Sequence, residues 1–355
     1  MAKERIISGQ PIDESDERFN QSLRPTCMAD YVGQPKLVEK LKITLTAVKS
    51  RGEPMEHVLL HGPPGLGKTT LAHIIAHEMG THVSVTSGPA LSKPTDLVGT
   101  LSNLQHGDVL FIDEIHRLTP VVEEYIYPAM EDFKIDFTVD KGMHAKTITL
   151  PLKPFCLIGA TTRAGLLTAP MRGRFGITHS FDFYGEQDLI KVLTRSAAVL
   201  HIDGATPDAN PGSTELAHAL RTIARRSRGT PRIANRLLRR VRDFAEVKGD
   251  GRLSASMVND ALDLEGVDDL GLDEMDRKYL DIIAKVYEGG PVGLEAVAAT
   301  MGEDAGTLED VVEPYLLQIG FLARTRKGRQ LTAGAAERLN LHLPKERAYQ
   351  DGLFR

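Results

Sequence analysis

One stretch constrains this 355-residue chain most, Val58–Thr70, which reads VLLHGPPGLGKTT. Its apolar start predicts a short buried strand, and a turn rich in glycine and proline follows. Leu71, Ile74 and Ile75 then recur with the period of a helix. Strand, glycine loop and helix in this order are the context that a P-loop requires. The sequence therefore predicts a nucleoside triphosphate site in an α/β domain with a parallel sheet and flanking helices.

The residues of the loop have separate predicted roles. The glycines let the backbone curl until successive N–H groups face phosphate oxygens, and the helix N-terminus adds its positive end. The lysine side chain is long enough to reach the outer phosphates, and the threonine hydroxyl that follows is expected to bind Mg²⁺. The predicted phosphate and magnesium residues are Gly62, Gly65, Gly67, Lys68, Thr69 and Thr70.

A second apolar run, Asp108–Asp113, ends in acids and is followed by Glu114. It predicts a buried strand whose carboxylates emerge at the C-terminal edge of the sheet, where open α/β sheets bind ligands. Asp113 is expected to hold Mg²⁺ through water, and Glu114 to polarise the water that attacks the γ-phosphate. An ordinary strand end is the alternative interpretation. The preceding P-loop favours the catalytic one.

Polar residues near a third apolar run, Phe155–Thr162, complete the predicted catalytic set. Thr161 or Thr162 could sense the γ-phosphate, and the sequence does not choose between them. The segment APMRGRF then supplies Arg172 and Arg174. Arginines near an ATP site can stabilise the transition state of a neighbouring subunit, although a solvated surface position is the commoner role for arginine.

Composition limits the remaining possibilities. The length predicts two or three domains, and Cys27 and Cys156 are too few for a disulfide framework. No stretch is long and apolar enough to suggest a membrane span, so we expect a cytoplasmic protein. Because the net charge is −5, any contact with DNA must come from local basic patches. Residues 1–20 are polar and acidic and predict a flexible arm.

Two segments of the first domain have open interpretations. Arg24, Tyr31 and Val32 precede a helix before the P-loop strand, and they could pack around an adenine or form a surface loop. Residues 134–153 alternate around Lys141-Gly142 and predict a hairpin. Its apolar face, which includes Ile148 and Leu150, could pack on the domain's own core or grip a partner.

Two basic segments follow. Residues 221–248 hold ten Lys/Arg against two Asp/Glu, and Gly229-Thr230-Pro231 places Arg232 at a helix start, which favours a directed role over a solvated face.

After Gly266, the pattern predicts three short helices, with a capping box of Thr307 and Asp310 before the third, and a basic hairpin over Arg324–Arg329. This is the pattern of a winged helix, which could bind DNA phosphates or a protein.

These segments together resemble the RuvB family of Holliday junction branch migration motors over about residues 20–340. The resemblance implies an AAA+ domain over residues 21–184, a helical lid over 185–265 and a winged-helix head over 266–343. Residues 344–355 lie outside the match and predict a polar tail. The resemblance also implies that residues 203–213 are an insertion in the lid. The motifs that carry it are Arg24-Pro25 with YVGQ, GPPGLGKTT, LFIDEIHRL, LIGATTRAG, RGRFG and GTPRIANRLLRR.

The resemblance also implies roles for single residues. Arg174 would be an arginine finger reaching the neighbouring subunit, Thr161 or Thr162 the first sensor, and Arg232 the second. Ile148 and Leu150 would contact the RuvA tetramer. Arg324 and Arg329 would contact DNA. The implied nucleotide contacts outside the P-loop are Arg24, Tyr31, Val32, Glu131, Asp132, Phe133, Tyr184 and Arg232.

The sequence as a whole predicts a DNA-dependent ATPase with ATP and Mg²⁺ as cofactors. By resemblance it forms a homohexameric ring on duplex DNA and works with RuvA and the RuvC resolvase in homologous recombination and DNA repair. Two other functions remain open. One is a clamp-loader-like ATP switch, against which the basic wing argues. The other is a DNA-binding module with a relic P-loop, against which the Asp113-Glu114 pair argues.

Overall fold

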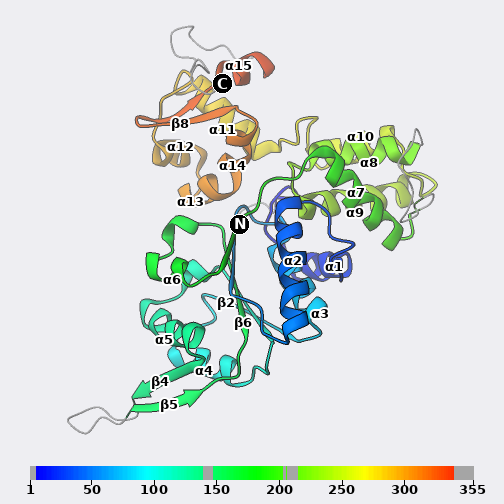
Figure 1. Cartoon of the computed structure of the whole chain (residues 1–355). Coiled ribbons are helices and arrows are strands. Elements are labelled where there is room, and N and C mark those ends of the chain that lie inside the picture. The colour runs from blue at the N-terminus through cyan, green and yellow to red at the C-terminus, as the bar shows by residue number, and fades with distance from the viewer. Residues whose placement is uncertain (1–4, 139–146, 203–204, 206–214, 340–355) are drawn as a thin grey trace. The chain divides into compact units, whose positions relative to one another are not determined.

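The computed structural model describes residues 5–138, 147–202, 205 and 215–339. The chain divides into two compact units, and each is described by itself. One unit is Arg18–Asp188, and the other combines Met1–Glu17 with Leu189–Arg355. Figure 1 shows the elements of both. Among the described residues, no helix has the length and apolar character needed to cross a bilayer.

The first unit is built on a five-stranded parallel sheet with the order β2-β3-β6-β1-β7. The predicted third strand, β6, therefore lies between the P-loop strand β1 and the acidic strand β3. Thr161 lies opposite His61 of β1 in the register. The C-terminal ends of these strands share one edge, which confirms the predicted sheet. The strands are β1 (Val58–His61), β2 (Val83–Ser87), β3 (Val109–Asp113), β6 (Cys156–Thr161) and β7 (Ile177–Ser180).

Apolar residues of the sheet face helices on both sides. Leu110 and Ile112 join a buried core with residues of α4 and α5, while Phe111 between them alternates to the face on which α3 packs. This alternation explains why the strand reads as a continuous apolar run. The helices are α2 (Pro35–Arg51), α3 (Lys68–Met79), α4 (Pro94–Ser102), α5 (Pro120–Glu131) and α6 (Ala169–Gly173), with 3₁₀ turns η1 (Ile115–Arg117) and η2 (Ala164–Leu166).

The predicted hairpin is present as the antiparallel strands β4 (Lys134–Thr138) and β5 (Thr147–Pro151), while its predicted turn at 141–142 lies outside the described residues. Figure 1 shows this ribbon extending beyond α4 and α5. Ile135 is fully buried, whereas the side chain of Ile148 on the opposite strand is 44% exposed. Part of the apolar hairpin therefore packs on the domain's core, and part faces outward.

The second unit contains the lid helices, in which basic residues are buried. Arg226 and Arg236 are 4% and 2% exposed. The run of arginines is therefore not a solvated helix face, because several of its members pair with acids inside the fold. The proposed insertion at 203–213 lies, apart from residue 205, outside the described residues. The helices are α7 (Glu186–Val199), α8 (Glu215–Arg226), α9 (Pro231–Lys248) and α10 (Ala255–Leu264).

The C-terminal part of this unit has the predicted winged-helix elements. The capping box of Thr307 and Asp310 is wrong, because Asp304 caps the helix instead and accepts the N–H of Thr307 at 3.0 Å. Pro314 follows a π-helical turn, so the helix is irregular at that proline. The elements are α11 (Glu274–Lys285), α12 (Leu294–Met301), α13 (Ala305–Thr307), η3 (Leu308–Val312), α14 (Glu313–Gln318), β8 (Leu322–Thr325), β9 (Gly328–Leu331) and α15 (Ala333–Arg338).

The N-terminal segment differs from the free arm expected over residues 1–20. The structure gives it a helix, α1 (Glu14–Ser22), and buries Ile7 to 2% exposure. The guanidinium of Arg236 donates to three backbone carbonyls between residues 6 and 10 and to the carboxylate of Asp16. A polar, acidic sequence thus becomes ordered because its backbone and its acids satisfy an arginine of the lid.

Candidate functional site

The P-loop has the backbone geometry predicted for it. Gly62, Gly65 and Gly67 all have positive φ angles, of 136°, 79° and 100°. A Cβ at Gly62 would lie 2.8 Å from the carbonyl oxygen of Phe181, so a side chain does not fit there. Helix α3 begins at Lys68, directly after this loop. The positive end of this helix therefore lies at the loop, where it favours an anion.

The side chain of Lys68 closes the same loop. Its Nζ donates to the carbonyl oxygens of Gly62 and Pro63, at 2.8 Å each. The residue is only 7% exposed. The ammonium group is thus held across the loop that would receive phosphates. This position agrees with the predicted role of Lys68.

Two of the predicted adenine-side residues are adjacent. The hydroxyls of Tyr31 and Tyr184 lie 3.4 Å apart, and Tyr184 also donates to the carbonyl of Leu66. A Cβ at Gly33 would lie 2.4 Å from the ring of Tyr184, so glycine permits this packing. Burial raises the pKa of Tyr184 to about 12 and that of Tyr31 well above its usual value, which keeps both phenols neutral. The other two adenine-side residues, Arg24 and Val32, lie in the segment that precedes α2, and both are half-buried.

Asp113 and Glu114 stand at the C-terminal end of β3, as the sequence predicted. Glu114 has a left-handed backbone, with φ 51° and ψ 41°, and its N–H donates to Asp113 Oδ1 at 2.9 Å. A Cβ at Gly88 would lie 2.5 Å from the carbonyl oxygen of Glu114. A non-glycine residue in this conformation costs free energy, and such strain concentrates at functional sites. The Glu114 side chain is 30% exposed.

His116 is a residue of this site that the sequence analysis missed. Its Nδ1 lies 2.8 Å from the hydroxyl of Thr161, and its Nε2 lies 3.8 Å from Glu114 Oε2. Burial lowers the pKa of His116, although Glu114 acts in the opposite direction. Thr161 is fully buried, whereas Thr162 is partly exposed. The only local signal was a histidine two residues after Glu114.

The predicted arginine finger is bound within its own unit. Arg174 Nη2 lies 3.2 Å from Glu131 Oε1, and Nη1 donates to the carbonyl of Pro170 at 2.8 Å. The guanidinium also lies over the ring of Tyr127, with its carbon 4.1 Å from the ring centroid. The structure thus brings together Arg174 and Glu131, both of which were predicted to contact nucleotide.

Asp132 and Phe133, the other two residues of that predicted group, contact different parts of the unit. Asp132 pairs with Lys134 at 2.9 Å. The ring of Phe133 packs edge-on against Phe155, with centroids 5.8 Å apart. Phe133 therefore packs against the core of the unit.

The predicted Mg²⁺ ligands fit a metal that arrives with a nucleotide. Thr69 offers a hydroxyl and Asp113 a carboxylate, and Mg²⁺ prefers such oxygen ligands. In the part of the chain that the structure describes, no group of three or more His, Cys, Asp or Glu side chains could hold a metal ion. Two protein oxygens suit Mg²⁺, because phosphates and water normally supply the rest of its shell.

Arg232, the predicted second sensor, belongs to the unit that contains the lid. Its Nη2 pairs with Glu17 Oε2 at 2.9 Å, and its Nη1 donates to the carbonyl of Gly9 at 3.4 Å. Arg232 lies at the start of α9, as the Gly229-Thr230-Pro231 sequence predicted. In this structure the N-terminal segment therefore engages the guanidinium.

The predicted DNA contacts, Arg324 and Arg329, lie on paired strands of the wing and face Glu313. Arg324 Nε donates to Glu313 Oε2 and Arg329 Nε to Oε1, both at 2.8 Å. The phenol of Tyr279 donates to the same carboxylate at 2.7 Å. Glu313 is fully buried. Burial would raise its pKa, but the hydrogen bonds from Arg329, Tyr279 and Arg324 outweigh this effect and lower it.

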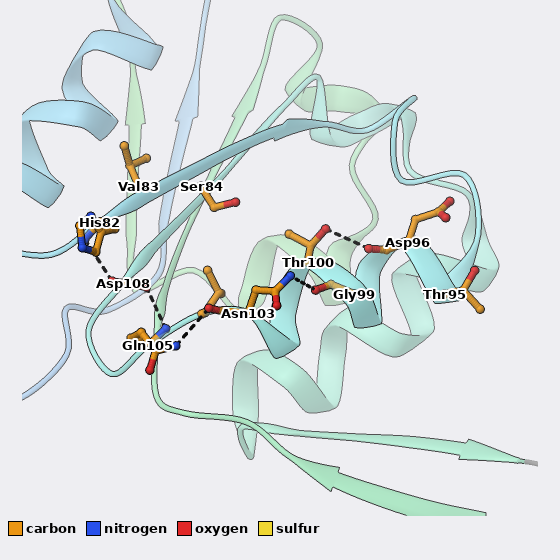
Figure 2. Close-up of a pocket in the computed structure, with 11 residues that line it drawn as sticks. His82, Val83, Ser84, Thr95, Asp96, Gly99, Thr100, Asn103, Gln105 and Asp108 are labelled. Carbon is orange, nitrogen blue, oxygen red and sulfur yellow. Dashed lines mark hydrogen bonds between the residues drawn. The ribbon is translucent and has the colours of Figure 1, made fainter.

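A groove of about 580 Å³ opens between β2, at the edge of the sheet, and α4 (Figure 2). Its polar groups are largely satisfied locally. Thr100 donates to the carbonyl of Asp96, and Asn103 donates to that of Gly99. The carboxylate of Asp108 accepts backbone N–H groups. None of these interactions singles out a ligand, so we assign no binding role to this groove.

Comparisons with known proteins agree with this arrangement. Residues 23–181 match the model of the Holliday junction DNA helicase RuvB P-loop domain, 184–268 the RuvB AAA lid domain and 269–340 the RuvB C-terminal winged helix domain. Among solved structures, the Thermotoga maritima RuvB Holliday junction branch migration motor is 48% identical. The match covers 91% of this chain and 100% of that one, with a TM-score of 0.79. A mutant of the same protein matches at 48% identity, with 91% and 99% coverage and a TM-score of 0.80.

Proposed function

Because the chain belongs to the RuvB family of Holliday junction DNA helicases, which are P-loop ATPases, we propose that it drives branch migration of Holliday junctions in recombination and repair. It does so as a homohexameric ring on duplex DNA that cooperates with RuvA and the RuvC resolvase. One observation carries the catalytic part of the proposal. The P-loop that leads to Lys68 follows β1, Glu114 follows β3 and Thr161 ends β6, and these are neighbouring strands of one parallel sheet.

The chemistry follows from these positions. Lys68 and the P-loop N–H groups bind the phosphates of ATP, and Thr69 and Asp113 hold Mg²⁺. The metal supplies neutralisation of the phosphate charge when it is bound. Glu114 accepts a proton from the attacking water, and its partly exposed carboxylate is open to such a water.

The first sensor is Thr162. The hydroxyl of Thr161 is buried and already bonded to His116 and to the N–H of Arg163. The next residue is partly exposed just beyond the strand. Thr162 is thus the better placed of the two candidates to meet a γ-phosphate or its attacking water.

Arginines outside the loop complete the cycle. Arg174 leaves Glu131 and contacts the γ-phosphate in the neighbouring subunit, where it stabilises negative charge in the transition state. Arg232 acts as the second sensor in the lid.

The exposed Ile148 and the half-buried Leu150 of the hairpin form the contact with RuvA. The wing binds DNA phosphates without reading bases, which suits a motor that moves along any sequence.

The test is ATP-dependent dissociation of a synthetic four-way junction. It is run with and without RuvA, and with Lys68→Ala as the control. The proposal predicts dissociation that needs both ATP and Lys68 and that increases when RuvA is added. If ATP is hydrolysed without junction movement under either condition, the protein is an ATP switch and the motor proposal is wrong.

A further inference from the structure

His116 is buried between two predicted catalytic groups, and the proposed function does not use it. Its side chain is only 6% exposed. It lies on η1, the 3₁₀ turn that starts directly after Glu114. It also hydrogen-bonds Thr161, which lies 45 residues away in sequence at the end of β6. His116 therefore connects the ends of two neighbouring strands.

The hydrogen bonds around Thr161 favour one tautomer of the imidazole. The Thr161 hydroxyl accepts the N–H of Arg163 at 3.0 Å, so its single proton is available to Nδ1 of His116 at 2.8 Å. When Nδ1 accepts this proton, a neutral imidazole carries its own proton on Nε2. The Nε2–H group is then the one that faces Glu114.

The side chain of Glu114 is held more loosely than that of His116. Its Oε2 lies 3.8 Å from His116 Nε2, beyond hydrogen-bond length, and 3.9 Å from Arg117 Nη1. Arg117 is 58% exposed, whereas His116 is fixed by burial and by Thr161. A small rotation of the glutamate closes the gap to Nε2, and catalytic hydrogen bonds often tighten in this way when substrate binds.

We propose that His116 is a positioning residue for ATP hydrolysis. Thr161 orients the imidazole, and Nε2–H donates to one oxygen of the Glu114 carboxylate, which aims the other oxygen at the attacking water. The water's proton moves to Glu114, and the Nε2 proton stays on His116. This inference rests on the proposed role of Glu114 as the base.

Two substitutions separate the two contacts of the imidazole. His116→Asn places an amide near the former Nδ1 and keeps a partner for Thr161, but it removes the donor that faces Glu114. His116→Gln places an amide donor near the former Nε2 and loses the partner of Thr161. A purely structural histidine would be replaced best by asparagine, whereas a positioning histidine would be replaced best by glutamine. His106→Asn, at an exposed histidine of the same unit, is the matched control.

The experiment measures kcat and KM for ATP, equilibrium binding of ATP and thermal unfolding of the full-length protein with Mg²⁺ and junction DNA. We expect His116→Asn to lower kcat about 10- to 100-fold, the usual loss for an outer partner of a catalytic group. ATP affinity and the melting temperature should stay close to wild type. His116→Gln should retain more of kcat than His116→Asn, and His106→Asn should retain all of it.

A second comparison tests whether the histidine acts through the glutamate. Adding His116→Asn to Glu114→Gln should cause no further loss of kcat, because the carboxylate to be positioned is already gone. Two outcomes would overturn this inference and leave the proposed role of Glu114 intact. One is wild-type kcat in His116→Asn. The other is an equal loss of kcat in the asparagine and glutamine variants together with lower melting temperatures. Wild-type turnover in Glu114→Gln would instead overturn the role of Glu114 as the base, and the inference with it.

Discussion

Two glutamates of this chain are held in opposite ways. Glu114 follows a strand and itself has a strained backbone, and its side chain is 30% exposed. Its carboxylate lies 3.8 Å from the imidazole of His116 and 3.9 Å from the guanidinium of Arg117. Glu313 begins a helix, is fully buried and accepts hydrogen bonds of 2.7 to 2.8 Å from Tyr279, Arg324 and Arg329. A carboxylate that is surrounded on all sides stabilises a fold, whereas one that is loosely held remains open to a substrate. The length and number of contacts to the carboxylate thus distinguish a structural glutamate from one that is open to substrate.

Arg174 does not follow the difference seen between the two glutamates. It is bonded within its own unit, yet it has a proposed catalytic role in a second subunit. We expect Arg174→Ala to assemble normally but to lose about 10³-fold in ATP turnover, the lower end of the range for an arginine finger. Sedimentation and steady-state hydrolysis measure the two properties.

Mixing provides the control for a shared site. Arg174→Ala and Lys68→Ala subunits lack different halves of it, so a mixed ring contains some complete sites and should regain turnover. If mixing restores no activity, Arg174 does not act in trans. Wild-type turnover in Arg174→Ala alone would show that Arg174 has no catalytic role beyond its contacts within its own unit.

Glu114→Gln tests the loosely held glutamate. Removing a general base costs about 10²- to 10⁴-fold in rate, and an amide cannot accept the proton of water as a carboxylate does. ATP binding should remain, because the P-loop is unchanged. Rapid-quench hydrolysis and nucleotide binding on the same sample give both numbers, and a parallel loss of affinity would contradict the assignment.

Glu313→Gln tests the tightly held glutamate. Removing the buried charge leaves the two arginines with only Glu309, at 3.5 and 3.6 Å, as an acidic partner among the described residues, so we expect a cost of at most about 3 kcal/mol. That free energy corresponds to roughly 100-fold faster hydrogen exchange in β8 and β9 when exchange follows opening of the wing. Exchange in the P-loop unit serves as the internal control. Unchanged protection of the wing would mean that the network contributes little stability.

The same residue predicts a pH dependence of the wing. The pKa of Glu313 is lower in the folded protein than its usual value, which is about 4.3 in an unfolded chain. Its contribution to stability is therefore complete above that value and is lost as the pH falls through the lower folded pKa. Wing protection in the wild type should decline in that acidic range, and Glu313→Gln should lack this part of the decline.

The smallest effect concerns DNA binding by the wing. Arg326 and Lys327 are exposed at its tip, while Arg324 and Arg329 are bonded to Glu313. Replacing both tip residues with alanine should reduce the slope of log K against log salt by about 2 and weaken binding evenly across sequences. Arg324→Ala should change wing stability more than the slope. A slope change in Arg324→Ala would support the predicted contact with phosphate.

The sequence predicted local features of the fold and site well. The P-loop and the strand that ends in Asp113 depend on apolar runs and glycines within short stretches. Their chemistry also requires particular residue types at fixed spacing. This is why roles for Lys68 and Glu114 could be proposed from the sequence.

What the sequence did not reveal depends on distant partners. His116 meets Thr161 across 45 positions, and Arg236 meets Asp16 across 220. Counting basic residues in the lid and the wing could not show which arginines have acids beside them. The same cause explains the ordered N-terminal segment, because its acidic composition predicted a free arm while its partners lie in the lid.

The most direct test of the account measures ATP hydrolysis and four-way junction dissociation together in three samples: wild type, Glu114→Gln, and the double variant Arg326→Ala/Lys327→Ala. The account predicts that Glu114→Gln loses both activities. It also predicts that the wing variant keeps its DNA-independent ATP hydrolysis but dissociates junctions more slowly. Junction dissociation by Glu114→Gln at the wild-type rate would contradict an ATP-driven motor built on this site.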